Sequence, residues 1–140
     1  MALKWGATRA FNAGKDTLIN DIRSAVPRLD AAIMAVPSDT AMVQAMELVR
    51  SSAPILLFSH TRKGVRSQVH LSCIFLEEKY LIGNYSSDYT LQKEVASLVF
   101  TRCLDIRGII THTFPLCQTA AAIALASKPS GELLKVVVVQ

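Results

Sequence analysis

The side chains best suited to bind a metal ion in this sequence are three histidines and three cysteines, and they are widely scattered. They are His60, His70, His112, Cys73, Cys103 and Cys117. Zinc needs ligands that converge, and its protein ligands usually stand in short paired spacings such as CxxC. Only His70 and Cys73 stand three positions apart, and they would face the same way only in a helix. We therefore expect no zinc and no metal ligands in this chain.

The motifs of nucleophilic catalysis and of phosphate binding are also missing from the sequence. There is no GxSxG elbow to expose a nucleophilic serine, and neither GxGxxG nor GxxxxGK[ST] occurs. Ser86, Ser87 and Asp88 follow a predicted strand, where they are ordinary turn formers. The carboxyl ends of parallel strands are, however, also where open α/β sheets bind ligands. The sequence thus predicts no catalytic residue and favours this strand end slightly as a binding position.

The elements that would position these residues alternate between short apolar runs and longer amphipathic segments. That alternation is typical of βα units around a mostly parallel sheet, so the expected class is α/β. Segment 69–76 is predicted as a short extended piece or a turn of helix. The predicted strands are 8–11, 30–36, 54–59, 79–85, 109–114 and 134–139, and the predicted helices are 17–26, 39–49, 91–103 and 119–127.

Single residues mark several of the expected element ends. Gly6 is placed to close a helical turn in the left-handed conformation. Asp16 is expected to cap the helix over 17–26, and Ser38 or Asp39 the helix that follows the second strand. Gly83, inside a predicted strand, indicates close backbone packing or a bulge.

Length and composition predict one domain of 140 residues, since 51% of them are hydrophobic. The net charge of +4 is spread thinly, and its one cluster, Arg62, Lys63 and Arg66, is interpreted as a solvated loop. With only 6% aromatic residues, no stacking surface for a nucleic-acid partner is expected. An odd number of cysteines without a CxxC pair favours a reducing, cytoplasmic location. No signal core and no membrane-spanning run are found.

Three phrases in order carry a family resemblance: LIGNYSSDY at 81–89, ITHTFPL at 110–116 and GELLKVVVV at 131–139. With KWGA at 4–7, they resemble the closing part of a zinc-type medium-chain alcohol or polyol dehydrogenase. The resemblance implies a partial Rossmann-like, three-layer domain with a mostly parallel sheet, truncated at its N-terminus. Within one domain, residues 1–106 would form part of the NAD(P)-binding region, and 107–140 the return segment that joins the catalytic domain.

In that family, segment 8–11 would be the third strand of the Rossmann sheet, and 30–36, 54–59 and 79–85 the fourth to sixth. Strands one and two, which normally separate the third from the fourth, would lie before Met1. The third strand then either detaches or closes directly against the fourth through the helix over 17–26. We expect the second arrangement, because a right-handed crossover permits it.

The resemblance also implies six residues that face the cofactor. Carried over by position, they are Val36, Phe58, Ser59 and His60 beside the nicotinamide half of NAD(P), and Tyr85 and Ser86 near the ribose and the reaction centre. The sequence departs from the family pattern nearby. Pro37 stands where a glycine is usual, no glycine follows Phe58, and residues 51–53 replace a Pro-Gly-Gly turn. These changes add bulk where backbone normally approaches the cofactor.

The family's catalytic zinc and glycine-rich turn would precede Met1. Without the zinc there is no Lewis acid for the alkoxide, and without the turn little holds the pyrophosphate. The chain alone is therefore expected to be inactive, and its expected partner is a second copy or the missing N-terminal half. Two alternatives stay open: a non-catalytic α/β module that binds itself or a partner, and an enzyme subunit completed in trans.

Overall fold

The computed structural model describes residues 2–59, 64–85, 88–128 and 130–140. Its internal contacts divide the chain into two compact units. One comprises Ala10–Ser87 and is called here the three-stranded unit, and the other comprises Met1–Arg9 with Asp88–Gln140 and is called the two-stranded unit. Each is described by itself, and the single-domain organisation expected from the sequence stays a prediction.

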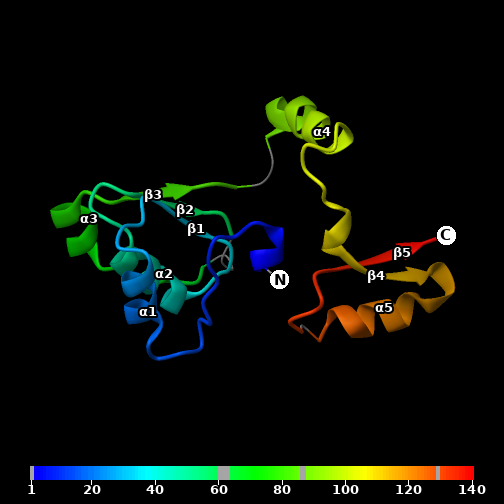
Figure 1. Cartoon of the computed structure of the whole chain (residues 1–140), viewed down its shortest axis with the longest axis horizontal. Helices are drawn as coiled ribbons and strands as arrows, with labels where there is room; N and C mark the ends of the chain where they lie inside the picture. The colour runs from blue at the N-terminus through cyan, green and yellow to red at the C-terminus, as the bar shows by residue number, and fades with distance from the viewer. Residues whose placement is uncertain (1, 60–63, 86–87, 129) are drawn as a thin grey trace. The chain divides into compact units, whose positions relative to one another are not determined.

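The three-stranded unit is built on a parallel sheet with the strand order β1-β2-β3 (Figure 1). Its strands are β1 (Ala32–Met34), β2 (Pro54–Leu57) and β3 (Tyr80–Gly83). All three lie inside segments predicted as strands, although each is shorter than predicted. The α/β class and the partial Rossmann-like arrangement are therefore confirmed.

The helices of this unit lie on one side of its sheet (Figure 1). They are α1 (Leu18–Ala25), α2 (Asp39–Leu48) and α3 (Leu71–Glu77). Crossovers of one hand between parallel strands in sequential order place their helices on the same face. The core forms under them from Met34, Met46, Val49, Ala53 and Ile55. Of the three layers expected, this unit contains two.

The helix starts agree with the sequence in one case and differ in another. Ser38 caps α2, because its Oγ accepts a hydrogen bond from the backbone N–H of Ala41 at 3.2 Å. Asp16 does not cap α1. The residue at the cap is Thr17, and its hydroxyl donates to the Asp21 carboxylate at 3.0 Å instead. Segment 69–76, left open between strand and helix, contains most of α3.

The predicted strand over 8–11 is wrong, and so is its closure against the fourth strand, which is β1. These residues are exposed and have no strand pairing. Directly after them the Asn12 side chain accepts the N–H of Gly14 at 3.0 Å, which turns the chain. Four residues without a buried face gain too little from pairing to form a strand. Among the described residues, β1 therefore pairs along its length with β2 alone.

The two-stranded unit contains a parallel pair, β4 (Ile110–Pro115) and β5 (Lys135–Val139). The connection between them holds the 3₁₀ turn η4 (Leu116–Gln118) and helix α5 (Thr119–Ala126). Earlier in this unit lie η1 (Ala2–Trp5), η2 (Tyr89–Leu91), α4 (Gln92–Phe100) and η3 (Arg107–Ile109). No helix in the described part of the chain is long and apolar enough to cross a bilayer.

The ends of these elements follow from local conformation. Gly6 has a φ of +92°, which confirms the left-handed cap after η1. Asp88 accepts the N–H of Thr90 at 2.8 Å and caps η2, which leads into α4. Helix α4 ends at Phe100, earlier than the predicted 103, and Arg102 two residues later is left-handed with a φ of +59°.

Candidate functional site

A cavity of about 750 Å³ opens at the carboxyl ends of the three parallel strands. Met34, Leu57 and Gly83 stand opposite one another as the last paired residues of β1, β2 and β3, and all three line the cavity. Ligands of open α/β sheets bind beyond this edge of the sheet. The cavity is therefore the candidate site of the three-stranded unit.

The connection from β1 to α2 forms one wall of this cavity. Val36, Pro37, Ser38 and Asp39 all line it. The Ser38 N–H donates to the carbonyl of Val36 at 3.0 Å, and the Ser38 hydroxyl oxygen caps α2. These two bonds hold the wall in a tight turn, so the first turn of α2 borders the cavity.

The residues that follow β2 and β3 form the opposite wall. The N–H of Ser59 donates to the carbonyl of Met34 at 2.9 Å, and the N–H of Asn84 donates to the carbonyl of Leu57 at 3.3 Å. Both bonds continue the ladder past the strand ends and fix the residues that line the cavity. Tyr85 stands at the rim with 88% of its surface exposed.

Gly83 does not have the role that its position in a strand suggested. A Cβ built on Gly83 meets no atom within 4 Å, so no neighbouring backbone or side chain requires a glycine here. The interpretation as close packing is therefore wrong. The hydrogen atoms of Gly83 face open space at the cavity, and a glycine there lets a ligand approach the backbone.

The structure brings three of the six predicted cofactor-facing residues together. Val36, Ser59 and Tyr85 line the cavity. Phe58 is not among the lining residues, and strand alternation directs its exposed side chain to the other side of the sheet from Leu57. His60 and Ser86 lie outside the described residues. That these residues bind a cofactor stays a prediction.

Sequence reasoning missed several residues of this wall. Ser38, Asp39 and Asn84 are polar and line the cavity. The rule that ligands bind at strand ends would have found Asn84, which directly follows Gly83. The sequence predicted that α2 begins at Ser38 or Asp39, but it did not show that this first turn lines the same cavity as the ends of β2 and β3.

The described lining suits the binding of an uncharged or weakly polar group. Its apolar part includes Met42 and Leu81, and its hydrogen-bonding part consists of serine hydroxyls and the Asn84 amide. Asp39 is the one carboxylate among the described lining residues, and none of them is lysine, arginine or histidine. An apolar floor with a few polar groups at its rim orients a flat ring and bonds its substituents.

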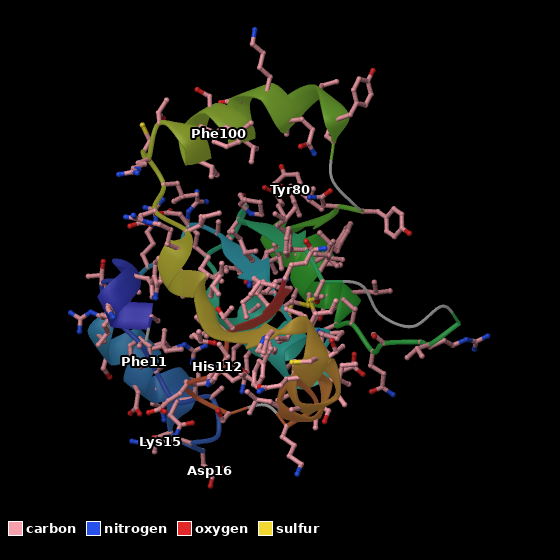
Figure 2. All side chains as sticks on the ribbon, turned by 90° about the vertical axis from the view of Figure 1, so that its right-hand side faces the viewer. Phe11, Lys15, Asp16, Tyr80, Phe100 and His112 are labelled. Carbon is pink, nitrogen blue, oxygen red and sulfur yellow. The ribbon has the colours of Figure 1, made fainter. Side chains whose placement is uncertain are left out.

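The described residues hold no group of three or more His, Cys, Asp or Glu side chains that is arranged for a metal ion. His70 and Cys73 line a second cavity of about 410 Å³, since α3 is helical and places them on one side. His112, on β4 (Figure 2), contacts the Thr111 hydroxyl through Nδ1 at 3.0 Å. The structural role predicted for His112 agrees with this hydrogen bond.

The second cavity lies beside a buried lysine. The Lys79 side chain is only 2% exposed, and its Nζ lies 2.7 Å from an oxygen of Glu77 and donates to the carbonyl of Met46. A hydrogen bond from Lys79 and its charge, with a bond from Cys73, lower the pKa of Glu77. This arrangement satisfies a buried charge and joins α3, β3 and the last turn of α2.

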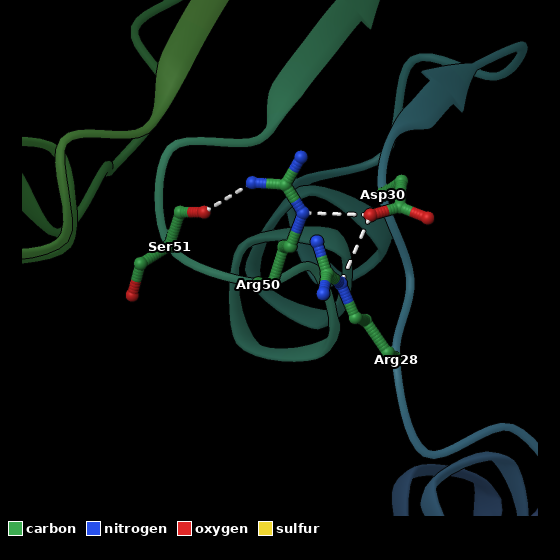
Figure 3. Close-up of polar contacts among 4 residues, drawn as sticks. All are labelled: Arg28, Asp30, Arg50 and Ser51. Carbon is green, nitrogen blue, oxygen red and sulfur yellow. Dashed lines mark hydrogen bonds and ion pairs between the residues drawn. The ribbon is translucent and has the colours of Figure 1, made fainter.

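An ion-pair cluster stands on the segment that leads into β1 (Figure 3). One oxygen of Asp30 lies 2.7 Å from Nε of Arg50 and 3.1 Å from Nε of Arg28. The hydrogen bond from Arg50, followed by the charge of Arg28, lowers the pKa of Asp30. Arg50 also donates to the carbonyl of Ser51 at 2.8 Å. The cluster ties the approach to β1 to the segment between α2 and β2, far along the strands from the cavity.

No family model matches the sequence, and no curated protein matches it. Solved structures do share its fold. A short-chain alcohol dehydrogenase of E. coli CFT073, complexed with NADH, matches with a TM-score of 0.83 at 21% identity, over 96% of this chain and 39% of that chain. A candidate zinc-binding dehydrogenase of Sinorhizobium meliloti 1021, bound to NADP, matches with a TM-score of 0.85 at 20% identity. The match covers 99% of this chain and 41% of that chain. The 2R,3R-butanediol dehydrogenase of Bacillus subtilis matches with a TM-score of 0.82 at 17% identity. The match covers 99% of this chain and 40% of that chain.

The fold of this chain is thus the fold of part of these alcohol and zinc-binding dehydrogenases. The resemblance found in the sequence is confirmed at the level of the fold. The chain spans about two-fifths of the length of the dehydrogenases that it matches.

Proposed function

We propose that this chain is the C-terminal part of an NAD(P)-dependent, zinc-type alcohol or polyol dehydrogenase and that it is inactive by itself. In this proposal its cavity forms the nicotinamide side of the cofactor site. The single observation that carries the proposal is the position of Val36, Ser59 and Tyr85. These three residues, chosen from the family resemblance, line one cavity at the strand ends.

The chemistry of the cavity agrees with this role. A nicotinamide ring is flat, and its carboxamide needs a few hydrogen-bond partners. In this proposal Ser59 and Asn84, which line the cavity, would provide them. Gly83 leaves the floor open to a ring. A bound NAD(P) would supply the hydride acceptor. The residues of this chain would hold and orient its nicotinamide and exclude water from it.

Two observations support the inactivity that we propose. The described residues hold no metal-ligand cluster, and the sequence contains no glycine-rich phosphate turn. In the proposal, both come from the rest of a longer or assembled dehydrogenase. A cytoplasmic location is part of the proposal, and it is supported by three free cysteines, Cys73, Cys103 and Cys117.

Two titrations test the proposal. In the first, NADH fluorescence is followed as the chain is added, and only weak binding, with a Kd on the order of 1 mM, is expected because the pyrophosphate has no seat. A micromolar Kd would show that the chain is competent for the whole cofactor. In the second, nicotinamide mononucleotide is added to labelled protein, and the amide resonances of Ser59, Gly83 and Asn84 should shift. If none of these three amide resonances shifts, the proposal that the cavity binds the nicotinamide is wrong.

A pair of glycine variants controls the second titration. Gly83→Val fills the cavity floor without meeting a protein atom, so it should abolish the shifts while the chain stays folded. Gly131→Val also adds its side chain to open space, but in the two-stranded unit, and should leave the shifts intact. Adenosine monophosphate, which has a phosphate and no nicotinamide, should not shift the three amides.

A further inference from the structure

The second cavity lies at the opposite end of β3 from the candidate cofactor cavity. Lys79, directly before β3, lines the second cavity, whereas Gly83, the last residue of β3, lines the first. Met46 of α2 and Cys73 of α3 belong to the walls of the second cavity. The proposed cofactor binding uses none of these wall residues. The chemistry of the second cavity is therefore independent of the proposed function.

The second cavity contains a half-buried thiol, that of Cys73. The other two cysteines, Cys103 and Cys117, are exposed, and neither lines this cavity. A thiol in the wall of a cavity has space beside it for a group that becomes attached to its sulfur. The two exposed thiols have the same intrinsic chemistry without that space, so they serve as internal references in the same molecule.

Lys79 supplies a buried hydrogen-bond donor to the same cavity. Its side chain is only 2% exposed, and an ammonium group has three N–H donors. Two of these donors have partners, the carbonyl of Met46 and the carboxylate of Glu77. The described residues offer no acceptor to the third. A buried donor without a partner is unfavourable, so an acceptor in the cavity, such as the carboxylate of a ligand, would be stabilised there.

The lining of the second cavity carries charges of both signs. Arg23 of α1 and Glu47 of α2 lie 3.1 Å apart, and each side chain is about half exposed. Together with Lys79 and Glu77 they give the described lining, apart from His70, two cations and two carboxylates. A ligand with one ammonium and one carboxylate matches this lining, whereas a purely acidic or purely basic ligand lacks half of the contacts. The volume of about 410 Å³ suits a group of amino-acid size.

We propose that Cys73 is a site of reversible S-thiolation and that the second cavity holds a low-mass thiol carrying both an ammonium and a carboxylate. The reactant is the disulfide of that thiol. The Cys73 sulfur attacks one of the two sulfurs, a new disulfide bond forms to Cys73, and the old disulfide bond breaks. The leaving sulfur takes up the proton that Cys73 loses. One disulfide and one thiol are thus converted into a mixed disulfide and a free thiol, without a further oxidant.

Three disulfide reagents test this proposal on the whole chain. Each half of cystine carries both charges, each half of cystamine only the ammonium, and each half of dithiodipropionate only the carboxylate. Peptide mass spectrometry follows the modified fraction of every cysteine. Dividing the rate at Cys73 by the rates at Cys103 and Cys117 cancels the intrinsic reactivity of each reagent. This ratio should be at least about fivefold higher for cystine than for the other two reagents, because each of those lacks one charged contact.

The same reactions in urea show whether the preference depends on the fold. In the unfolded chain the ratio should be similar for the three reagents, since the cavity is absent. If the ratio in the folded chain is also the same for all three, the proposal is wrong. The proposal is equally wrong if Cys73 is not modified by cystine in the folded chain.

Two variants of half-exposed residues identify the charged contacts without changing the buried pair. Arg23→Gln should reduce the advantage of cystine over cystamine about twofold, and Glu47→Gln should reduce its advantage over dithiodipropionate by a similar factor. Lys15→Gln is the control, because Lys15 is exposed in the loop before α1 and does not line the cavity (Figure 2). If Lys15→Gln has the same effect as Arg23→Gln, net charge and not the cavity determines the rates, and the proposal is wrong.

Discussion

The indole ring of Trp5 lies directly against the backbone of Gly108. A Cβ at position 108 would stand 2.7 Å from Cζ2 and 2.8 Å from Cη2 of that ring. An indole cannot move aside as the end of a flexible side chain does. The contact joins η1 to η3 across about a hundred residues of sequence, and it requires glycine for space.

Gly108→Ala is therefore expected to displace the ring and to destabilise this contact by about 1–3 kcal/mol, the usual cost of overpacking. Trp5 is the only tryptophan, so its fluorescence reports the change directly and should shift to the red. Gly131→Ala, which adds its methyl group to open space, serves as the control. Unchanged emission in Gly108→Ala would show that Trp5 does not pack there in solution.

The Asp30 cluster predicts an acid-dependent loss of stability. Folding lowers the pKa of Asp30 from its ordinary 3.8, chiefly through the hydrogen bond from Arg50. Its stabilising contribution is therefore present above pH 3.8 and is lost as the pH falls through the lowered value. Asp30→Asn should be less stable than the unchanged chain at pH 7, and the two should converge in strong acid. Urea unfolding at several pH values measures this.

Asp16→Asn is the control for this experiment, because Asp16 is an exposed aspartate in the loop before α1 (Figure 2). It should follow the unchanged chain at every pH. A constant difference between Asp30→Asn and the unchanged chain down to the lowest pH would contradict the role of the Asp30 charge.

Lys79 is the buried charged residue among those that the structure describes. Lys79→Ala removes the donor to the Met46 carbonyl and leaves that buried oxygen and the Glu77 carboxylate without their cation. We expect about 2–3 kcal/mol of destabilisation, measured by urea unfolding. Lys135→Ala, at an exposed position on β5, should stay within about 0.5 kcal/mol. Equal costs for the two variants would show that the buried pair contributes nothing.

Ser52 stands in the left-handed region with a φ of +57°. It lies in the segment where the family resemblance implies a Pro-Gly-Gly turn. Left-handed backbone costs a non-glycine residue about 1–2 kcal/mol, and glycine loses about 0.5–1 kcal/mol more backbone entropy on folding. Ser52→Gly should therefore stabilise the chain by about 0.5 kcal/mol in thermal unfolding.

The neighbouring residue gives the matched comparison. Ser51 has no positive φ, so Ser51→Gly should destabilise the chain by about 0.5–1 kcal/mol. If both substitutions destabilise equally, the left-handed conformation of Ser52 is not strained in solution.

Where the sequence carries a strong local signal, the fold was predictable from it. The apolar run 54–59 bounded by turn residues contains β2, and Ser38 caps α2 as expected. The strand predicted over 8–11 does not form. A short sequence pattern can be compatible with a strand, but it does not show whether a neighbouring strand is there to pair with it. The prediction that Asp16 caps α1 was wrong because Asp16 and Thr17 are both residue types that suit a helix start, and the local sequence does not distinguish them.

The candidate site was predictable only where strand ends mark it. Val36, Ser59 and Tyr85 are the last residues of three predicted strands, and they do line the cavity. Phe58 is not among the residues that line this cavity, since a side chain next to a strand end changes face with each position. The start of α2 near Ser38 was predicted, but that its first turn lines the cavity is seen only in the three-dimensional structure.

The open space beside Gly83 gives this position an unusual mutational signature. Folding alone places no steric demand on the residue, so a library of variants sorted only for folded protein should accept most residues that favour strands there. A library sorted for ligand binding should keep glycine. The difference between the residues accepted at position 83 in the two libraries would distinguish selection for folding from selection for function at this one position.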